Sequence, residues 1–564
     1  MKMLRMSCVF VGFMSLVLSL SAQTFTTLYS FGSMTNEGNY LLGGLVQATD
    51  GNFYGTTQEG GANPSCDGGT GCGTVFKLTP SGTLTTLHSF CSQAGCPDGE
   101  FPYSGLVQAT DGNFYGTTYE GGTNNGGTIF KITPSGTLTT LYSFCSQGRS
   151  ICPDGQGPIG GLIQGSNGSL YGTTWVGGLS SCAYPCGTVF KITTAGALTT
   201  LYSFTGFADG GKPAAGLVQG SNGNFYGTTN AGGANGFGGT VFEITPNGTL
   251  TTLHSFDGTD GSAPAAALVQ AANGNLYGTT SNGGAGTLGT IFKMTPAGAL
   301  TTLYSFCLQS GCPDGELPSG GMVQATDGNL YGTSYEGGIN ESGTVFRITP
   351  AGTLTTLHLF CTLSNCADGQ NSRASLIQGT NGNLYGTTQI GGADGAGSVF
   401  SLSVGLAPFV ETQPTAGRVG AVVKILGQGF TGTTGVSFNG KAATFKVWSK
   451  TYLTATVPSG ATTGFVTVLT PAGTLKSNKT FRVTPQIASF SPPSGPVSTP
   501  VVITGVSLSQ TSKVIFGGVK ATAFTVNSDT QVTATVPTGA VTGKITIATA
   551  GGTATSAATF TVTP

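Results

Sequence analysis

Three short motifs recur along the chain, and this repetition limits the fold more than any other feature. The first, FYGTT or LYGTT, has its tyrosine at positions 54, 115, 171, 226, 277, 331 and 385. The second, GTVFKITP and its variants, begins at 73, 127, 187, 239, 289, 343 and 397. The third, LTTLYSF, ends in phenylalanine at 31, 90, 144, 204, 256, 306 and 360. The mean spacing of about 55 residues is typical of a propeller blade or a large solenoid unit.

Each repeating unit is predicted to form four short strands. In residues 105–144, the segments 105–110, 114–118, 128–133 and 137–144 are β-compatible, and the turn sequences DGN and PSG lie within the two hairpins. Glycine accounts for 95 of 564 residues and charged residues for only 8%. This composition excludes long solvated helices and coiled coils, which need charged outer faces.

The two ends of the repeat region predict a closed ring. The chain opens with a lone third motif at 24–31, and the last unit, 375–404, lacks that strand. In a propeller the N-terminal strand completes the last blade and removes the open edge. An open solenoid would instead need atypical capping units. We therefore predict an all-β chain with a seven-bladed β-propeller over residues 24–404.

The repeated unit also carries a family resemblance. The sequence GLVQATDGNFYGTTYEGG followed by GTIFKITPSGTLTTLYSF resembles the Gloeo/Verruco (GloVer) tandem repeat of bacterial exported proteins. It is more distantly similar to NHL-type blades. The resemblance implies a secreted or surface repeat protein. It implies no established activity, so no catalytic residue is carried over.

The C-terminal third consists of two similar segments, 409–484 and 485–564. YLTATVPSGATTGFVTVLTPAG in the first corresponds to QVTATVPTGAVTGKITIATAGG in the second. The short alternating strands predict two small β-sandwiches. Both segments resemble IPT/TIG domains, which are immunoglobulin-like. The resemblance implies a spacer, a glycan-associated unit or an adhesion module.

The first residues have the features of a leader. Lys2 and Arg5 precede an apolar run, Val9–Leu20, followed by Ser21 and Ala22. This predicts a signal peptide over residues 1–23, and the run is too short for a comfortable membrane span. We expect a secreted, extracellular or cell-surface protein without a transmembrane span in the mature chain, with the periplasm as the alternative. A net charge of −1 argues against nucleic acid or anionic lipid as partners.

Twelve of the thirteen cysteines fall into six close pairs, which predicts six disulfides in an exported chain. The pairs are Cys66/Cys72, Cys91/Cys96, Cys145/Cys152, Cys182/Cys186, Cys307/Cys312 and Cys361/Cys366. Zinc is the alternative. Each two-cysteine loop would supply half a tetrahedral site, and no histidine follows to complete it.

Few residues carry ordinary catalytic chemistry. His88, His254 and His358 occupy the same position of the third motif, where other units have tyrosine. We interpret them as half-exposed packing residues in different blades, which leaves no shared general base or metal site. No catalytic residue and no cofactor is predicted, with calcium as the one alternative.

One acid per unit lies in the loop that leads to each first strand. These acids are Asp98, Asp154, Asp209, Asp260, Asp314 and Asp368, with Glu37 in the remaining unit. We expect them to ring the channel mouth, where Asp98, Asp154 and Asp314 are weak calcium candidates. The favoured interpretation is that each aspartate caps its own turn. DGN is likewise interpreted as a hairpin turn.

Departures from the repeat are better candidates for a ligand site than the repeat itself, because blade packing does not explain them. The candidates are Glu59, Glu120 and Glu336 in EGG sequences, with Tyr119, Trp175 and Tyr335 beside them. Exposed aromatic rings next to acids suit stacking on sugars and hydrogen bonding to their hydroxyls. Surface drift between units is the favoured interpretation of these departures.

The sequence therefore predicts an exported, non-enzymatic binding, adhesion or scaffold protein, whose partner is a polysaccharide or another surface protein. The first alternative is a carboxylate-dependent polysaccharide lyase or hydrolase, for which Glu100 and Glu316 are acids that other units lack. The second is a purely structural envelope protein.

Overall fold

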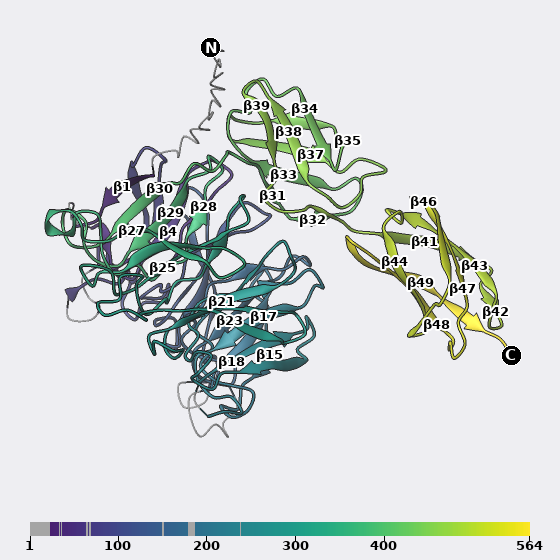
Figure 1. The fold of residues 1–564 in the computed structure, drawn as a ribbon, viewed down its shortest axis with the longest axis horizontal. Coiled ribbons are helices and arrows are strands. Elements are labelled where there is room, and N and C mark those ends of the chain that lie inside the picture. The colour runs from purple at the N-terminus through teal and green to yellow at the C-terminus, as the bar shows by residue number, and fades with distance from the viewer. Residues whose placement is uncertain are drawn as a thin grey trace, which may run out of the picture.

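The computed structural model describes residues 23–564, apart from 33, 35, 64, 65, 67, 68, 149–151, 179–185 and 237. The predicted signal peptide, except its last residue, and Cys182 lie outside the described residues. The described part is all-β, with a short 3-10 helix, η2 (Ser364–Cys366). A large group of sheets is followed by two separate sandwiches (Figure 1). Among the described residues, no helix has the length and apolar character needed to cross a membrane.

The described residues of the repeat region form seven four-stranded antiparallel sheets, numbered here in chain order. Sheet 1 is β3 (Val46–Gln47), β4 (Phe53–Thr57), β6 (Thr74–Leu78) and β7 (Leu84–Ser89). Sheet 2 is β8 (Val107–Gln108), β9 (Phe114–Thr118), β10 (Thr128–Ile132) and β11 (Leu138–Ser143). Sheet 3 is β12 (Ile163–Gln164), β13 (Leu170–Thr174), β14 (Thr188–Ile192) and β15 (Leu198–Ser203). Sheet 4 is β16 (Val218–Gln219), β17 (Phe225–Thr229), β18 (Thr240–Ile244) and β19 (Leu250–Ser255).

The remaining sheets follow the same order. Sheet 5 is β20 (Val269–Gln270), β21 (Leu276–Thr280), β22 (Thr290–Met294) and β23 (Leu300–Ser305). Sheet 6 is β24 (Val323–Gln324), β25 (Leu330–Ser334), β26 (Thr344–Ile348) and β27 (Leu354–Leu359). Sheet 7 is β28 (Ile377–Gln378), β29 (Leu384–Thr388), β30 (Ser398–Ser403) and β1 (Thr24–Ser30). A short pair, β2 (Gly38–Asn39) and β5 (Glu59–Gly60), lies beside sheet 1.

The repeated motifs supply the contacts between neighbouring sheets. The tyrosine of FYGTT is buried against the next sheet: the rings of Tyr54 and Phe114 stack with their centroids 4.1 Å apart. Inside the same motif, a Cβ on Gly55 would lie 2.6 Å from Cζ of Phe76, so the ring requires glycine there. Equivalent apolar clusters join each sheet to the next, and Phe53 of sheet 1 meets Tyr385 of sheet 7 at 4.2 Å.

The first strand of the chain joins the last repeating unit, as predicted. β1 pairs with β30 in antiparallel register, with Thr24 opposite Ser403 (Figure 1). A second circuit runs through the first strands of the sheets, where the side-chain oxygen of a glutamine accepts the N–H of a turn residue in the preceding sheet. The glutamines are Gln108, Gln164, Gln219, Gln270, Gln324, Gln378 and, returning to sheet 1, Gln47. The sheets are therefore propeller-like repeats whose last member contacts the first.

The two ends of the sheets differ. At one end, here the turn edge, tight turns join the first strand to the second and the third to the fourth. At the other end, the loop edge, longer loops join the second strand to the third and each sheet to the next. The small residues at the start of the first strands let these strands converge: a Cβ on Gly43 would lie 2.6 Å from backbone atoms of Ser104 and Gly105 in the next sheet. The mouth is the loop-edge end of these converging strands.

The first sandwich consists of two four-stranded sheets and one parallel pair. One sheet is β31 (Glu411–Gln413), β33 (Val422–Leu426), β37 (Tyr452–Thr456) and β36 (Phe445–Val447). The other is β35 (Lys441–Ala442), β34 (Gly435–Phe438), β38 (Val466–Thr470) and β39 (Gly473–Lys476). The pair is β32 (Ala416–Gly417) and β40 (Arg482–Val483). Phe438 and Phe481 meet edge to face in the buried core, at 5.0 Å.

The second sandwich repeats this plan. One sheet is β41 (Gln486–Ser491), β43 (Pro500–Val506), β47 (Gln531–Thr535) and β46 (Phe524–Ser528). The other is β42 (Ser494–Gly495), β49 (Gly552–Val562), β48 (Gly543–Thr549), β44 (Thr511–Phe516) and β45 (Val519–Lys520). Its core contains Phe516 and Phe560, 5.4 Å apart.

The first sandwich is docked on the turn edge of the ring. Lys424 Nζ donates to the carbonyl of Thr110 in sheet 2 at 2.7 Å, and Arg482 Nη1 donates to that of Ser221 in sheet 4 at 3.0 Å. Gln428 Nε2 donates to Oγ1 of Thr380 in sheet 7 at 2.9 Å. Contacts with three separated turns indicate that this sandwich extends across the turn edge and leaves the loop edge open.

Candidate functional site

On the loop edge, the acid present in every unit holds the outermost strand. Asp98 accepts the N–H of Cys91 at 3.1 Å, and its Oδ2 lies 2.8 Å from Nε2 of His88. The equivalent pairs are Tyr142 with Asp154 at 2.8 Å, Tyr202 with Asp209 at 3.0 Å, His254 with Asp260 at 2.6 Å, Tyr304 with Asp314 at 2.8 Å, His358 with Asp368 at 3.3 Å, and Tyr29 with Glu37 at 2.6 Å. The position is therefore part of the repeat's own framework.

These pairs correct the expectation that the acids ring the channel mouth. Each carboxylate is held beside the fourth, outermost strand of one sheet, because its partner is the tyrosine or histidine of that strand. The calcium candidates Asp98, Asp154 and Asp314 also accept the loop N–H groups of Cys91, Ser146 and Cys307. These bonds agree with the interpretation of turn capping, and calcium binding stays a prediction.

The DGN sequences lie at the turn edge, as predicted for hairpin turns. Asp50 accepts hydrogen bonds from the Asn52 N–H, the Tyr54 hydroxyl and the Lys77 ammonium. Burial disfavours the ionised form of Asp50, but the bonds from Lys77, Asn52 and Tyr54 outweigh this and lower its pKa. Gly51 follows with a φ of +83°, a left-handed conformation that favours glycine.

Two variable positions per unit lie side by side at the loop-edge end of each sheet. One follows the second strand directly, and its N–H bonds to the loop that enters the first strand. Its occupants are Gln58, Tyr119, Trp175, Asn230, Ser281, Tyr335 and Gln389. The other is on that entering loop, and its occupants are Leu42, Tyr103, Ile159, Ala214, Ala265, Ser319 and Arg373. The backbone arrangement is the same in each sheet, while most of the side chains at these two positions differ from one sheet to the next.

Large polar and aromatic side chains gather on one side of the mouth. Gln58 Nε2 donates to the Tyr103 hydroxyl at 3.1 Å. The rings of Tyr103 and Tyr119 meet edge to face, with centroids 5.1 Å apart. The Arg373 guanidinium lies 4.2 Å from the centre of the Tyr335 ring. We call this group the mouth cluster: Gln58, Glu59, Tyr103, Tyr119, Glu120, Tyr335 and Arg373.

The charges of the mouth cluster converge on Tyr103. Burial raises the pKa of the Tyr103 hydroxyl, and the neighbouring Tyr119, Glu120 and Glu59 raise it further, while Arg373 lowers it. Tyr103 therefore stays a neutral hydrogen-bond donor and acceptor. Sheets 1, 2, 6 and 7, which are consecutive around the ring, contribute the residues of the cluster.

Four of the predicted ligand residues belong to the mouth cluster, and the other two lie nearby. Glu59, Tyr119, Glu120 and Tyr335 are its members. Trp175 stands one sheet further: its N–H donates to Gly157, where a Cβ would lie 2.8 Å from the Tyr119 ring. Lys212 Nζ lies 5.5 Å from the centre of the Trp175 ring. Glu336 pairs through its backbone with Glu316 on sheet 6.

Sequence reasoning missed Tyr103 and Arg373. Each is a single departure at a position where most other units carry a small or aliphatic side chain, such as Ala214 or Ile159. That signal was available in the repeat alignment. Their contacts with Gln58 and Tyr335 were not, because they join different units.

The unusual acids Glu100 and Glu316 face disulfides. Oε2 of Glu100 lies 2.9 Å from Sγ of Cys66, and Oε2 of Glu316 lies 3.2 Å from Sγ of Cys312. Burial, Glu120 and Asp98 raise the pKa of Glu100. Burial and the neighbouring acids, Glu336 first among them, raise the pKa of Glu316.

The predicted cysteine pairing is confirmed for five of the six pairs, which are Cys66–Cys72, Cys91–Cys96, Cys145–Cys152, Cys307–Cys312 and Cys361–Cys366. Because disulfide sulfurs are not thiolates, the cluster of Cys66, Cys91, Cys96 and Glu100 does not offer zinc its usual ligands. The disulfides indicate a chain that folds in an oxidising compartment, in agreement with an extracellular or surface protein.

The sixth predicted pair, Cys182 with Cys186, is not confirmed in the same way. Cys186 is fully buried in sheet 3 and its sulfur is in a disulfide, as expected. Cys182 lies outside the described residues, so no S–S geometry joins the two cysteines. The assignment of Cys182 as the partner of Cys186 therefore stays a prediction.

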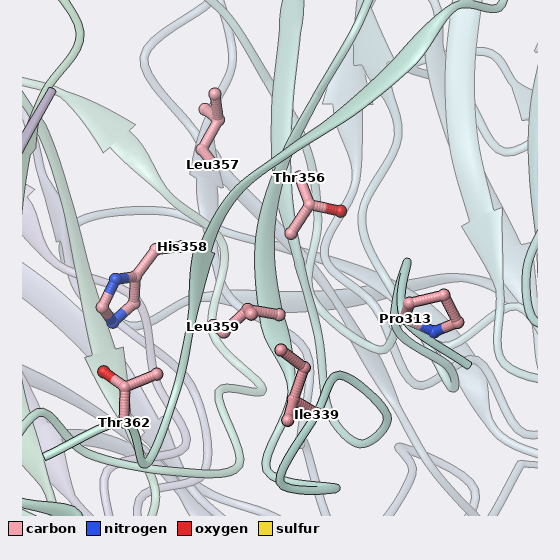
Figure 2. Close-up of a pocket in the computed structure, with 7 residues that line it drawn as sticks. All are labelled: Pro313, Ile339, Thr356, Leu357, His358, Leu359 and Thr362. Atoms are coloured by element: carbon pink, nitrogen blue, oxygen red, sulfur yellow. The ribbon is translucent and has the colours of Figure 1, made fainter. Parts of the chain in front are cut away.

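A hollow of about 370 Å³ lies away from the mouth, on β27 of sheet 6 (Figure 2). Its wall includes Ile339, Leu359, His358 and Thr362. Thr362 Oγ1 donates to Asp368 at 2.8 Å, and the His358 ring stacks on Phe25 of β1 at 3.7 Å. The imidazole and hydroxyl groups of this hollow thus already serve the packing between sheets 6 and 7.

Solved structures similar to this chain share little sequence with it. An extracellular domain described as part of a hybrid two-component system of B. thetaiotaomicron is 12% identical, with a TM-score of 0.43, over 95% of this chain and 56% of that one. A surface glycan-binding protein of Prevotella bryantii is 18% identical, with a TM-score of 0.22, over 27% of this chain and 41% of that one. A fungal alcohol oxidase in complex with copper is 14% identical, with a TM-score of 0.42, over 80% of this chain and 99% of that one. At these values the likenesses identify no shared function.

Sequence families give a clearer result. None of the curated proteins matches the chain. The model described as the Gloeobacter/Verrucomicrobia repeat matches residues 16–152, 149–322 and 308–418. The IPT/TIG domain model matches residues 409–483 and 485–562. The chain therefore belongs to the Gloeobacter/Verrucomicrobia repeat family and ends in two IPT/TIG domains.

Proposed function

We propose that residues 24–404 close into a seven-bladed β-propeller whose mouth cluster binds a polysaccharide, with the two IPT/TIG domains at 409–484 and 485–564 as a support. In this proposal the protein is an exported or surface-held binding protein without catalytic activity. The β1–β30 pairing and the circuit of glutamine bonds support the closed ring.

The observation that carries the binding proposal is the joining of Tyr103, Tyr119 and Arg373 at the mouth. Half-buried rings offer flat faces for the C–H groups of a sugar, and amide, carboxylate and guanidinium groups around them can bond its hydroxyls. Gln58, Glu59 and Glu120 supply such groups at the same place. Because the first sandwich occupies the turn edge, the open loop edge is the face that a long polymer can reach.

The proposal is tested with the chain from residue 24 to 564 on a glycan array, followed by calorimetry with each sugar that binds. Loss of one stacking ring is worth roughly 1.4 kcal/mol, or about tenfold in affinity. We expect Tyr103→Ala and Tyr119→Ala each to weaken binding by about this factor. The matched control is Phe207→Ala, which removes a 63% exposed ring elsewhere on the loop edge. Equal losses in all three variants would refute the mouth as the site.

A hydrolase or lyase is the second candidate, and one observation favours it. Glu100 and Glu120 lie opposite each other in a β-bridge. Burial, followed by the neighbouring Glu120 and Asp98, raises the pKa of Glu100, as is typical of a general acid. The contact of Glu100 with Cys66 turns its carboxyl towards a disulfide rather than a substrate. Release of shortened sugars, abolished by Glu100→Gln, would support the enzyme. Neither binding nor products on any array sugar would favour a purely structural role.

A further inference from the structure

The near-zero net charge of the chain hides a strong separation of charge. Residues 24–404 carry 20 Asp and Glu against 8 Lys and Arg, whereas residues 409–564 carry 11 Lys and Arg against 2 acids. The two sandwiches are therefore basic and the ring is acidic. The net charge of −1 therefore does not describe either part of the chain.

The edge of the first sandwich formed by β35, β36 and the turn after β36 carries three lysines, one of which lies against an aromatic ring. Lys441, Lys446 and Lys450 fall within ten residues, all are exposed, and no acid lies between them. Trp448 is 56% exposed, and the Lys446 ammonium lies 3.6 Å from the centre of its ring. We call Lys441, Lys446, Trp448 and Lys450 the basic edge. Within the described part of the chain, none of these lysines forms an ion pair.

The protection of edge strands accounts for Lys446 on β36 and for Lys441 on β35, but not for the tryptophan. β36 is the last strand of its sheet, and lysine on such a strand discourages pairing with other chains. An exposed indole has the opposite effect, because it adds apolar surface at the same place.

The second sandwich shows that the tryptophan is not needed for the fold. Trp448 Nε1 donates to Thr454 Oγ1 at 3.0 Å, and at the equivalent position Asn527 Nδ2 donates to Thr533 Oγ1 at 2.7 Å. Asparagine thus makes the same bond without an exposed ring. The indole of the first sandwich is a departure from the shared plan, in the same sense as the tyrosines of the mouth.

We propose that the basic edge binds an anionic polysaccharide, with Trp448 as the stacking platform and the three lysines as partners for the carboxylate groups of successive sugars. The Lys446 ammonium can swing from the indole to an incoming carboxylate, which frees the ring for the sugar's C–H face. The disulfides favour this occupant over nucleic acid, because they indicate an oxidising compartment outside the cytoplasm. An anionic surface attracts the sandwiches and repels the acidic ring, so the bound protein turns its loop edge outward.

The test uses the chain from residue 24 to 564 and polygalacturonate, a polymer of uronic acid, as the probe, with neutral dextran as its uncharged counterpart. We expect binding to polygalacturonate alone, weakened at least about tenfold between 50 mM and 500 mM salt as charge is screened. The triple variant K441Q/K446Q/K450Q and the single variant Trp448→Ala should each lose at least about tenfold in affinity. The control K77Q/K131Q/K293Q removes the same charge from the turn edge and should bind like the parent.

Several outcomes overturn the proposal. These are failure of the parent to bind polygalacturonate, an equal loss in the control, or tighter binding to duplex DNA or to anionic phosphatidylglycerol vesicles than to polygalacturonate. Sedimentation at low salt separates a further case: assembly of the parent into larger species that the triple variant abolishes would mean that the partner is the acidic ring of a second copy. If the basic edge is the site, Tyr103→Ala leaves the affinity for polygalacturonate unchanged. The proposal for the basic edge and the proposal for the mouth cluster can therefore fail independently of each other.

Discussion

The turn edge and the loop edge of the ring are built by the same seven units, yet they differ in how far the units are allowed to vary. At the turn edge each unit repeats an Asp or Asn turn bonded to its own tyrosine, and the first sandwich lies against several of these turns. At the loop edge the bonded acid is also repeated, but the two positions beside the mouth carry several different side chains among the seven units. Side chains thus vary most at the positions that the contacts between sheets do not fix.

Removal of the strand that joins the two ends of the ring is expected to have the largest effect on stability. A chain that begins at residue 32 lacks β1, leaves β30 without its outer partner and removes Phe31, which is fully buried. We expect this chain to lose its cooperative unfolding transition and to aggregate, because β30 then becomes an unpaired edge strand. Thermal unfolding followed by circular dichroism, together with gel filtration, measures the effect.

The control for that truncation removes a segment from the other end. A chain that stops after residue 484 lacks the second sandwich, whose sheets pair only among themselves. Its ring should unfold at the same temperature as that of the full chain. A stable, monomeric ring without β1 would show that the pairing of β1 with β30 is not needed to hold the ring together.

A smaller but still large effect is expected from a single ring in the repeated frame. Phe242 is fully buried and meets Phe204 of the preceding unit edge to face, with centroids 5.3 Å apart. Phe242→Ala should lower the free energy of unfolding by about 3–5 kcal/mol, since it opens a cavity between sheets. Tyr119→Ala at the half-buried mouth should cost less than about 1 kcal/mol. Urea denaturation measures both changes in the free energy of unfolding. Similar changes would show that the mouth contributes as much to stability as the packing between sheets.

The smallest effect concerns the pH dependence of one unit. Burial lowers the pKa of His358 below its ordinary value of 6.5, although Asp368 acts in the opposite direction. The unfolded chain therefore binds this proton more readily, so the contribution of His358 to stability is present above about pH 6.5 and is lost as the pH falls. His358→Tyr, the residue of other units at this position, should flatten the fall in melting temperature between about pH 7.5 and pH 5.

The matched control for this variant is His88→Tyr, in a unit whose histidine also faces an aspartate. It shows how far the exchange of histidine for tyrosine by itself shifts the melting temperature at pH 7.5. Parallel curves for His358→Tyr and the parent would show that burial of this ring does not set the pH response.

Local patterns were sufficient to predict most of the frame. FYGTT, GTVFKITP and LTTLYSF predicted the second, third and fourth strands, and the lone motif at 24–31 predicted the pairing of β1 with β30. The predicted location of Asp98 at the channel mouth was wrong. The sequence shows which loop carries this acid, but not that the loop places it beside His88 on the outermost strand. Arg373 and Tyr335 belong to successive units, and only the curvature of the ring brings them together.

The seam between β1 and β30 has a mechanical consequence. Every junction between successive sheets continues through the polypeptide. The ring is instead closed inside sheet 7, where β1 is joined to β30 by backbone hydrogen bonds and by rings such as Phe25 against Phe400, 5.1 Å apart. If the sandwiches are attached to a surface and a ligand is bound at the mouth, a force between the two acts on the chain just beyond β30. The contacts of the first sandwich with sheets 2, 4 and 7 transmit part of that force directly to these sheets, so the pairing of β1 with β30 bears less of it.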